Sequence, residues 1–106
     1  MAVRLSRSFV GKIFHNMEFV WNRRNIEHIA KHGISTGEAE WIVENANRPY
    51  PEMIGEGKRL VVGKVTSGEY VQIIYVPSRS VAGAVYVIHG RWLTDDEKRR
   101  FRRRKR

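Results

Sequence analysis

Three short runs rich in Val, Ile and Tyr dominate the second half of the chain. They span residues 59–65, 70–76 and 84–89, and stretches containing Gly and Ser separate them. β-Branched and aromatic residues fit a pleated, half-buried surface, and runs of this length between turn residues are typical of strands. Residues 66–69, which include Gly68, suit a hairpin turn. Both faces of the middle run are largely apolar, so the pattern predicts a sheet in which residues 70–76 form the central strand.

Two short helices are predicted ahead of this sheet. A short strand at residues 17–21 leads to Asn22, which can cap a helix whose apolar residues repeat at helical spacing. Gly33 suits the end of that helix, because glycine adopts the left-handed conformation at the least cost. Ser35 and Glu38 have the spacing of a capping box and predict the start of the second helix.

The order of the predicted elements indicates a single α+β domain. Residues 47–58 contain two Pro and two Gly and are predicted to form a loop between the helices and the sheet. Thr94 and Glu97 again have capping-box spacing, so a last helix is expected to run from there into the C-terminus. A chain of 106 residues is long enough for one modest core. We therefore expect two N-terminal helices, an antiparallel meander of three to four strands and a C-terminal helix.

Basic residues are concentrated at the C-terminus. The formal net charge is +9, and residues 98–106 contain eight Lys or Arg and no acidic residue, whereas residues 17–97 carry nine basic and eleven acidic residues. A dense positive segment attracts nucleic acid through phosphate neutralisation and counterion release, and it can also hold an acidic protein. We therefore divide the chain into an N-terminal extension at 1–16, a domain at 17–97 and a basic tail at 98–106.

Composition excludes several classes of protein. The chain has no cysteine, which excludes a disulfide framework and fits a reducing compartment. No apolar run approaches the ~20 residues of a membrane-spanning helix, and residues 1–16 lack the features of a signal peptide. His28 and His32 have the spacing of two metal ligands on one helix face, but no third ligand is evident. We expect a cytoplasmic protein that uses no metal or other cofactor and contacts no membrane.

Three short blocks of residues carry a resemblance to a known family. They are Trp21 to Ser35, with Lys31 and His32 near its end; Arg59 with Gly63; and Arg91 followed by Thr94 and Glu97. Together, over roughly residues 17–101, they resemble the BrnT-like toxins of bacterial type II toxin–antitoxin systems. The resemblance implies a RelE/ParE-like fold and a ribonuclease that stops growth by cutting RNA. It also implies a cognate antitoxin that silences the enzyme and, through the complex of the two proteins, contact with operator DNA.

The chain contains the groups that RNA cleavage without a metal requires. That reaction needs a base near the 2′-hydroxyl, an acid near the leaving 5′-oxygen and cations around the phosphorane. Arg59 begins the first strand of the predicted meander and Arg91 ends the last, so we expect the two to lie toward the same end of the sheet. His89 shares a strand face with Arg91 by the two-residue period. Arg59, His89 and Arg91 are the predicted catalytic residues, and an ordinary ion pair or solvated side chain is the alternative at each.

Further residues are predicted to bind nucleic acid. They are Lys31, His32, Lys58, Trp92, Lys98, Arg99, Arg102 and Arg103. For Lys31 and His32 a structural or antitoxin-contact role is the alternative, while Trp92 could stack on a base or on an antitoxin side chain. Phe101 stands where the family commonly has a Tyr in its last helix, and it is expected to pack on the sheet. If that Tyr is catalytic elsewhere, the alternative function is a non-catalytic nucleic-acid- or antitoxin-binding module, such as a decayed toxin.

Overall fold

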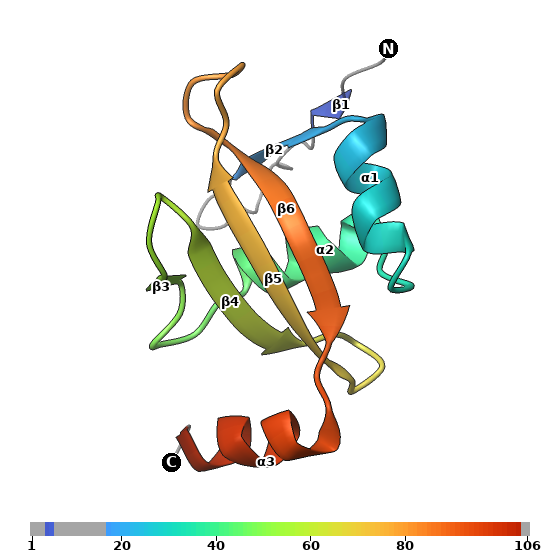
Figure 1. The fold of residues 1–106 in the computed structure, drawn as a ribbon, viewed down its shortest axis with the longest axis vertical. Helices are drawn as coiled ribbons and strands as arrows, with labels where there is room; N and C mark the ends of the chain where they lie inside the picture. The colour runs from blue at the N-terminus through green and yellow to red at the C-terminus, as the bar shows by residue number, and fades with distance from the viewer. Residues whose placement is uncertain (1–3, 6–16, 105–106) are drawn as a thin grey trace.

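A twisted sheet with helices on both of its faces makes up the part of the chain that the structure describes (Figure 1). In this computed structural model the described residues are 4–5 and 17–104. The strands are β1 (Arg4–Leu5), β2 (Glu18–Trp21), β3 (Glu52–Met53), β4 (Arg59–Lys64), β5 (Tyr70–Pro77) and β6 (Ala84–Trp92), and the helices are α1 (Arg23–Ala30), α2 (Thr36–Glu44) and α3 (Asp95–Arg104). The predicted α+β class is confirmed.

The described strands form one sheet in the order β1-β2-β6-β5-β4-β3. β2 and β6 pair in parallel, and every other pairing is antiparallel. The predicted turn between β4 and β5 is confirmed, since the Val65 N–H donates to the Glu69 carbonyl at 2.9 Å and Gly68 has a φ of 96°. The prediction that residues 47–58 form only a loop is wrong at Glu52–Met53, which pairs with the start of β4.

Side chains cap both N-terminal helices as the sequence predicts. The Asn22 side chain accepts from the Asn25 N–H at 3.1 Å and starts α1. At α2, the Ser35 hydroxyl accepts from the Glu38 N–H at 3.1 Å and the Glu38 carboxylate accepts from the Ser35 N–H at 2.9 Å. Gly33, with a φ of 76°, lies in the turn that ends α1. Each of these starts and stops is set by neighbours within three residues, which is why sequence reasoning finds them.

The main core lies between one face of the sheet and helices α1 and α2. Its largest fully buried side chains are Trp21, Phe19, Ile29, Ile34, Ile73, Val61, Val71 and Val87. Asn25 is a buried polar residue of this layer, with 2% of its surface exposed. Its amide donates to the carbonyls of Val20 and Val87, both at 3.1 Å. Because these carbonyls belong to β2 and β6, the Asn25 side chain fixes α1 over the parallel pair of strands.

Helix α3 packs on the opposite face, at one end of the sheet (Figure 1). Phe101, 8% exposed, clusters with Val62 and Leu93, and its ring centroid lies 5.1 Å from that of Tyr70. The predicted packing of Phe101 on the sheet is confirmed. The predicted boundary between the domain at 17–97 and the basic tail at 98–106 falls inside this helix, which spans Asp95–Arg104.

Most of the predicted N-terminal extension at 1–16 lies outside the described residues, as do residues 105–106. Within it, Arg4–Leu5 pairs antiparallel with β2. Among the described helices, none has the length and apolarity needed to span a membrane.

Candidate functional site

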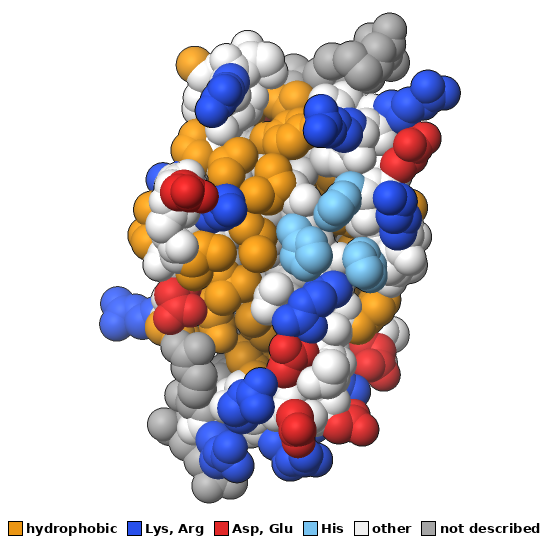
Figure 2. Space-filling model, in the orientation of Figure 1, with side chains coloured by type: hydrophobic (Ala, Val, Ile, Leu, Met, Phe, Trp, Pro, Cys, Tyr) orange, Lys and Arg blue, Asp and Glu red, His pale blue; other side chains and the backbone are white. Residues whose placement is uncertain are grey.

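Three histidine side chains come together where α1 lies beside β6. The ring centroids of His28 and His89 are 5.7 Å apart, and those of His32 and His89 are 6.0 Å apart. His28 and His32 are exposed on α1 and the turn that follows it, while His89 is half-buried on β6. Figure 2 shows the three side chains together on one face of the molecule, beside the apolar side chains of the sheet. We call these three residues the histidine cluster.

Two hydrogen-bonded links hold α1 against β6 and so bring the cluster together. Asn25 makes the first, near the start of the helix. Trp92 makes the second, because its indole N–H donates to the His32 carbonyl at 2.7 Å and its ring packs against the main core. The structure thus gives Trp92 a role in positioning His32. Its stacking on a base or on an antitoxin side chain stays a prediction.

The surroundings of His89 favour its neutral form. Partial burial lowers the pKa of His89 below its usual value of 6.5, and the positive charges of His28, His32 and Arg91 lower it further. A neutral imidazole can accept a proton, which is the property a general base needs near neutral pH. His89 is therefore suited to take a proton from a substrate.

Arg91 shares the strand face of His89, as predicted, but its guanidinium is held by Glu97. Its two terminal nitrogens donate to the two carboxylate oxygens of Glu97 at 2.8 and 2.7 Å. The Glu97 carboxylate also accepts from the Thr94 N–H at 2.9 Å, which confirms the predicted capping box of α3. These hydrogen bonds lower the pKa of Glu97 to about 2. Arg91 thus joins the end of β6 to the start of α3.

The depressed pKa of Glu97 makes folding stability depend on pH in the acid range. An ionised carboxylate with a folded-state pKa of about 2 stabilises the native state at pH values above its usual pKa of 4.5. We expect this contribution to be lost as the pH falls from about 4.5 toward 2, because protonation breaks the pairing with Arg91. Thermal unfolding of the parent and a Glu97→Gln variant across this range measures it. The gap between the two melting temperatures should narrow as the pH falls, and a constant gap would exclude this role for Glu97.

Arg59 lies on the opposite face of the sheet from His89, because His89 pairs with Ile74 and Arg59 with the next residue of β5. It pairs with Tyr75 of β5, whereas Arg91 pairs with Gln72, three residues away along the same strand. The prediction that the two arginines lie toward the same end of the sheet is wrong. β4 and β6 both run antiparallel to β5 and hence parallel to each other, so their starts lie at the same end of the sheet. Arg59 is at the start of β4 and Arg91 is near the end of β6, which places the two arginines toward opposite ends. The Arg59 side chain donates instead to the Gly57 carbonyl at 2.6 Å.

Arg24 is a cation at the cluster that sequence reasoning missed. It lines a pocket of about 390 Å³ together with His28. Within the described part of the chain Arg24 forms no ion pair, whereas its neighbour Arg23 pairs with Glu27 at 3.6 Å. The signal was present in the sequence, because Arg24 precedes His28 by four residues and such residues share a helix face.

Lys31 and Lys58, both predicted to bind nucleic acid, lie on different parts of the fold, at the end of α1 and before β4. Lys31 is exposed at the end of α1, next to His32. Lys58 precedes β4 and pairs with Glu56 at 3.4 Å. The structure therefore brings Lys31 near the histidine cluster and leaves Lys58 with Arg59.

The four predicted nucleic-acid contacts on α3 fall into two pairs. Lys98 lies 3.5 Å from a carboxylate oxygen of Glu69, and Arg99 forms an ion pair with a carboxylate one turn earlier. Arg102 and Arg103 are exposed and form no ion pair among the described residues. Arg102 and Arg103 are therefore the more available of the four to a phosphate.

Comparisons with known proteins found no match to this chain, whether among protein-family models, curated proteins or solved structures. Among the described residues, no group of three or more His, Cys, Asp or Glu side chains is arranged to hold a metal ion. What the site does must therefore be argued from its own imidazoles and arginines.

Proposed function

We propose that this protein is the toxin of a type II toxin–antitoxin system, a RelE-like ribonuclease that cleaves RNA without a metal ion. The histidine cluster beside Arg24 carries the proposal, since such cleavage needs a proton acceptor, a proton donor and a cation around one phosphate. The resemblance to BrnT-like toxins and the basic face of α3 support it. RNA is then the substrate, a cognate antitoxin the inhibitor, and operator DNA a contact made through their complex.

The proposed reaction is a transfer within the RNA strand. The 2′-oxygen attacks the adjacent phosphorus while His89, neutral because of its lowered pKa, takes the 2′-hydroxyl proton. The bond from phosphorus to the 5′-oxygen breaks, and His28 gives that oxygen a proton. The products are a 2′,3′-cyclic phosphate and a 5′-hydroxyl. The 5.7 Å between the two ring centroids allows both imidazoles to reach one phosphate group.

Two arginines stabilise the charge of the phosphorane in this proposal, in different ways. Arg24, without an ion pair among the described residues, binds the phosphate oxygens directly. Arg91 acts at longer range, because Glu97 holds its terminal nitrogens. Arg59 takes no part, since it shares a sheet face with Tyr75 of the main core, whereas His89 pairs with Ile74 and lies on the other face.

Growth of cells that express the protein without a partner tests the proposed function. The parent should arrest growth and deplete cellular RNA, and a His28→Ala/His89→Ala double variant should do neither. Arg24→Gln should weaken the effect, whereas Arg23→Gln, which removes the same charge one residue away, should not. A folded parent that neither slows growth nor depletes RNA would remove the toxin proposal.

The pKa of His89 predicts the acid side of the pH–rate profile. Because the base must be neutral, kcat/KM should rise with pH through the lowered pKa of His89, with a midpoint below 6.5. A His32→Gln variant should move this midpoint upward, since it removes a neighbouring positive charge that lowers the pKa. Initial rates on a short RNA over about pH 4–8 measure both effects. A midpoint above 6.5 in the parent would be incompatible with His89 as the base.

The salt dependence of RNA binding should separate the two pairs on α3. Each phosphate contact to single-stranded nucleic acid contributes about 0.7 to the slope of log Kobs against log salt. Arg102→Gln/Arg103→Gln should therefore lower the slope by about 1.4. Lys98→Gln/Arg99→Gln loses the same charge but should lower it less, because carboxylates already hold those two side chains. Equal slopes in the two double variants would show that the ion pairs of Lys98 and Arg99 do not reduce their contribution to RNA binding.

The pairing of Arg91 with Glu97 favours one alternative, a non-catalytic module that binds nucleic acid or an antitoxin. This pairing engages the guanidinium of Arg91, a predicted catalytic residue. Phe101, which stands where the family commonly has a Tyr, has no hydroxyl to take part in catalysis. Steep salt-dependent RNA binding without cleavage at any pH would select this alternative.

A further inference from the structure

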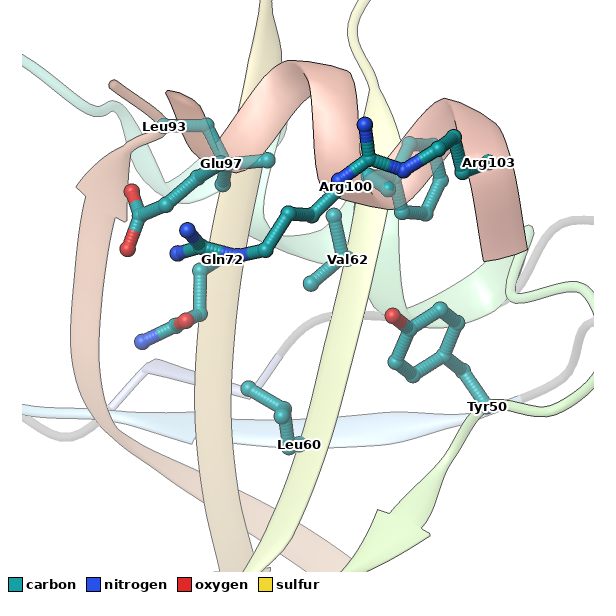
Figure 3. Close-up of a pocket in the computed structure, with 9 residues that line it drawn as sticks. Tyr50, Leu60, Val62, Gln72, Leu93, Glu97, Arg100 and Arg103 are labelled. Carbon is teal, nitrogen blue, oxygen red and sulfur yellow. The ribbon is translucent and has the colours of Figure 1, made fainter. Parts of the chain in front are cut away.

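A pocket between α3 and the sheet lies next to the proposed catalytic site. Its volume is about 450 Å³, within the roughly 300–1,000 Å³ typical of small-molecule sites. Figure 3 shows its floor, formed by Leu60 and Val62 of β4, with Tyr50 at one side and the Arg100 side chain reaching across from α3. The pocket therefore combines an apolar floor with a rim that carries Arg100, Arg103 and Glu97, whose carboxylate is paired with Arg91.

Three polar side chains at this pocket are available to a ligand. Arg100 and Arg103 line it and form no ion pair among the described residues. Gln72, on β5, also lines it, and its amide has no hydrogen-bond partner within the described part of the chain. Two guanidiniums suit a phosphate, and a carboxamide with one acceptor and two donors suits the edge of a nucleobase.

The pocket lies close to the histidine cluster along the sheet. Gln72 pairs with Arg91, and His89 is two residues from Arg91 on the same face of β6. Diagonal neighbours of this kind are about 7–8 Å apart. This separation is on the order of the distance between adjacent nucleotides of a single strand. An RNA strand at the cluster can therefore place a neighbouring nucleotide in the pocket.

We propose that this pocket binds one nucleotide of the RNA substrate next to the cleaved bond. The base lies on Leu60 and Val62 and forms hydrogen bonds with Gln72, while Arg100 and Arg103 bind its phosphate. The inference deepens the proposed function and rests on it for the identity of the substrate. An acidic peptide would use the same arginines, but the partner-free carboxamide and the distance to His89 favour a nucleotide.

Titration of the ¹⁵N-labelled protein with each of the four ribonucleoside 5′-monophosphates tests the pocket by NMR. At least one nucleotide should give saturable shifts of the Gln72 side-chain amide, and inorganic phosphate should bind more weakly and leave that signal in place. Arg100→Gln should raise the Kd about tenfold, as loss of a charge-assisted contact does. Arg79→Gln, which removes the same charge from the turn between β5 and β6, outside the pocket, should change it less than about twofold.

Three results would overturn the proposal. One is that no nucleotide shifts the Gln72 amide; another is that inorganic phosphate binds as tightly as every nucleotide. The third is that an acidic, apolar peptide shifts the Gln72 amide while the nucleotides do not, which would assign the pocket to a protein partner. Thermal unfolding of both arginine variants checks that each remains folded.

The variants Gln72→Ala and Arg100→Gln separate failure of the pocket proposal from failure of the ribonuclease proposal. Nucleotide binding that depends on Arg100, in a protein that cleaves no RNA, would retain the pocket and refute the enzyme. RNA cleavage whose rate and base preference are unchanged in Gln72→Ala and Arg100→Gln would retain the enzyme and refute the pocket.

Discussion

Replacement of His89 by alanine should lower RNA cleavage by about 10²–10⁴-fold, the usual contribution of general acid–base catalysis. The surroundings of His89 favour the neutral form that a general base requires, and the variant loses this imidazole. The side chain is only half-buried, and its loss should leave the fold intact. Single-turnover cleavage of a short RNA measures the rate, and thermal unfolding checks the fold.

Imidazole added to the solution provides the control for this variant. If His89 transfers a proton, free imidazole should restore part of the activity of His89→Ala and leave His28→Ala/His89→Ala inactive. Arg79→Gln, which removes a basic residue in the turn between β5 and β6, should cleave RNA like the parent. A folded His89→Ala variant that cuts RNA at the parent rate would exclude His89 from the reaction.

Replacement of Asn25 by alanine should lower the free energy of unfolding by about 2–4 kcal/mol, because it leaves buried polar groups unsatisfied and weakens a helix cap. The Asn25 side chain donates to the carbonyls of Val20 and Val87 and accepts from the Asn22 N–H. It is also one of the two links that hold α1 against β6. RNA cleavage should therefore fall even at temperatures at which the variant remains folded.

Asn45→Ala is the matched control for the stability measurement. The Asn45 amide donates to the Trp41 carbonyl at 2.8 Å in an exposed position at the end of α2. Its removal should cost about 1 kcal/mol or less, because water can satisfy the freed carbonyl. Urea denaturation of both variants gives the comparison. Equal losses of stability would show that burial of Asn25 does not anchor α1.

The parts of the fold that depend on neighbouring residues were predictable from the sequence. Capping boxes at Ser35 and Thr94 and the left-handed Gly33 involve contacts within a few positions. The parallel pairing of β2 with β6 joins segments more than sixty residues apart, and no local sequence pattern predicts it. That pairing carries α1 to the side of β6 and creates the histidine cluster.

Part of the candidate site was predicted from the sequence, and each incorrect prediction has a physical cause. His89 and Arg91 share a face because strand periodicity is local. The prediction for Arg59 is wrong because β4 and β6 run in the same direction on either side of β5, so the start of β4 and the end of β6 lie at opposite ends of the sheet. The spacing of His28 and His32 indicates that they share a helix face, but the position of His89 beside both depends on a contact between α1 and β6 that is distant in the sequence.

Analysis of the RNA ends produced by the purified protein in excess EDTA tests the central claim most directly. The account predicts cleavage under these conditions, with 2′,3′-cyclic phosphate and 5′-hydroxyl ends, and no cleavage by the His28→Ala/His89→Ala variant. Absence of cleavage by the folded parent, or cleavage that depends on an added metal ion or survives loss of both histidines, would contradict it.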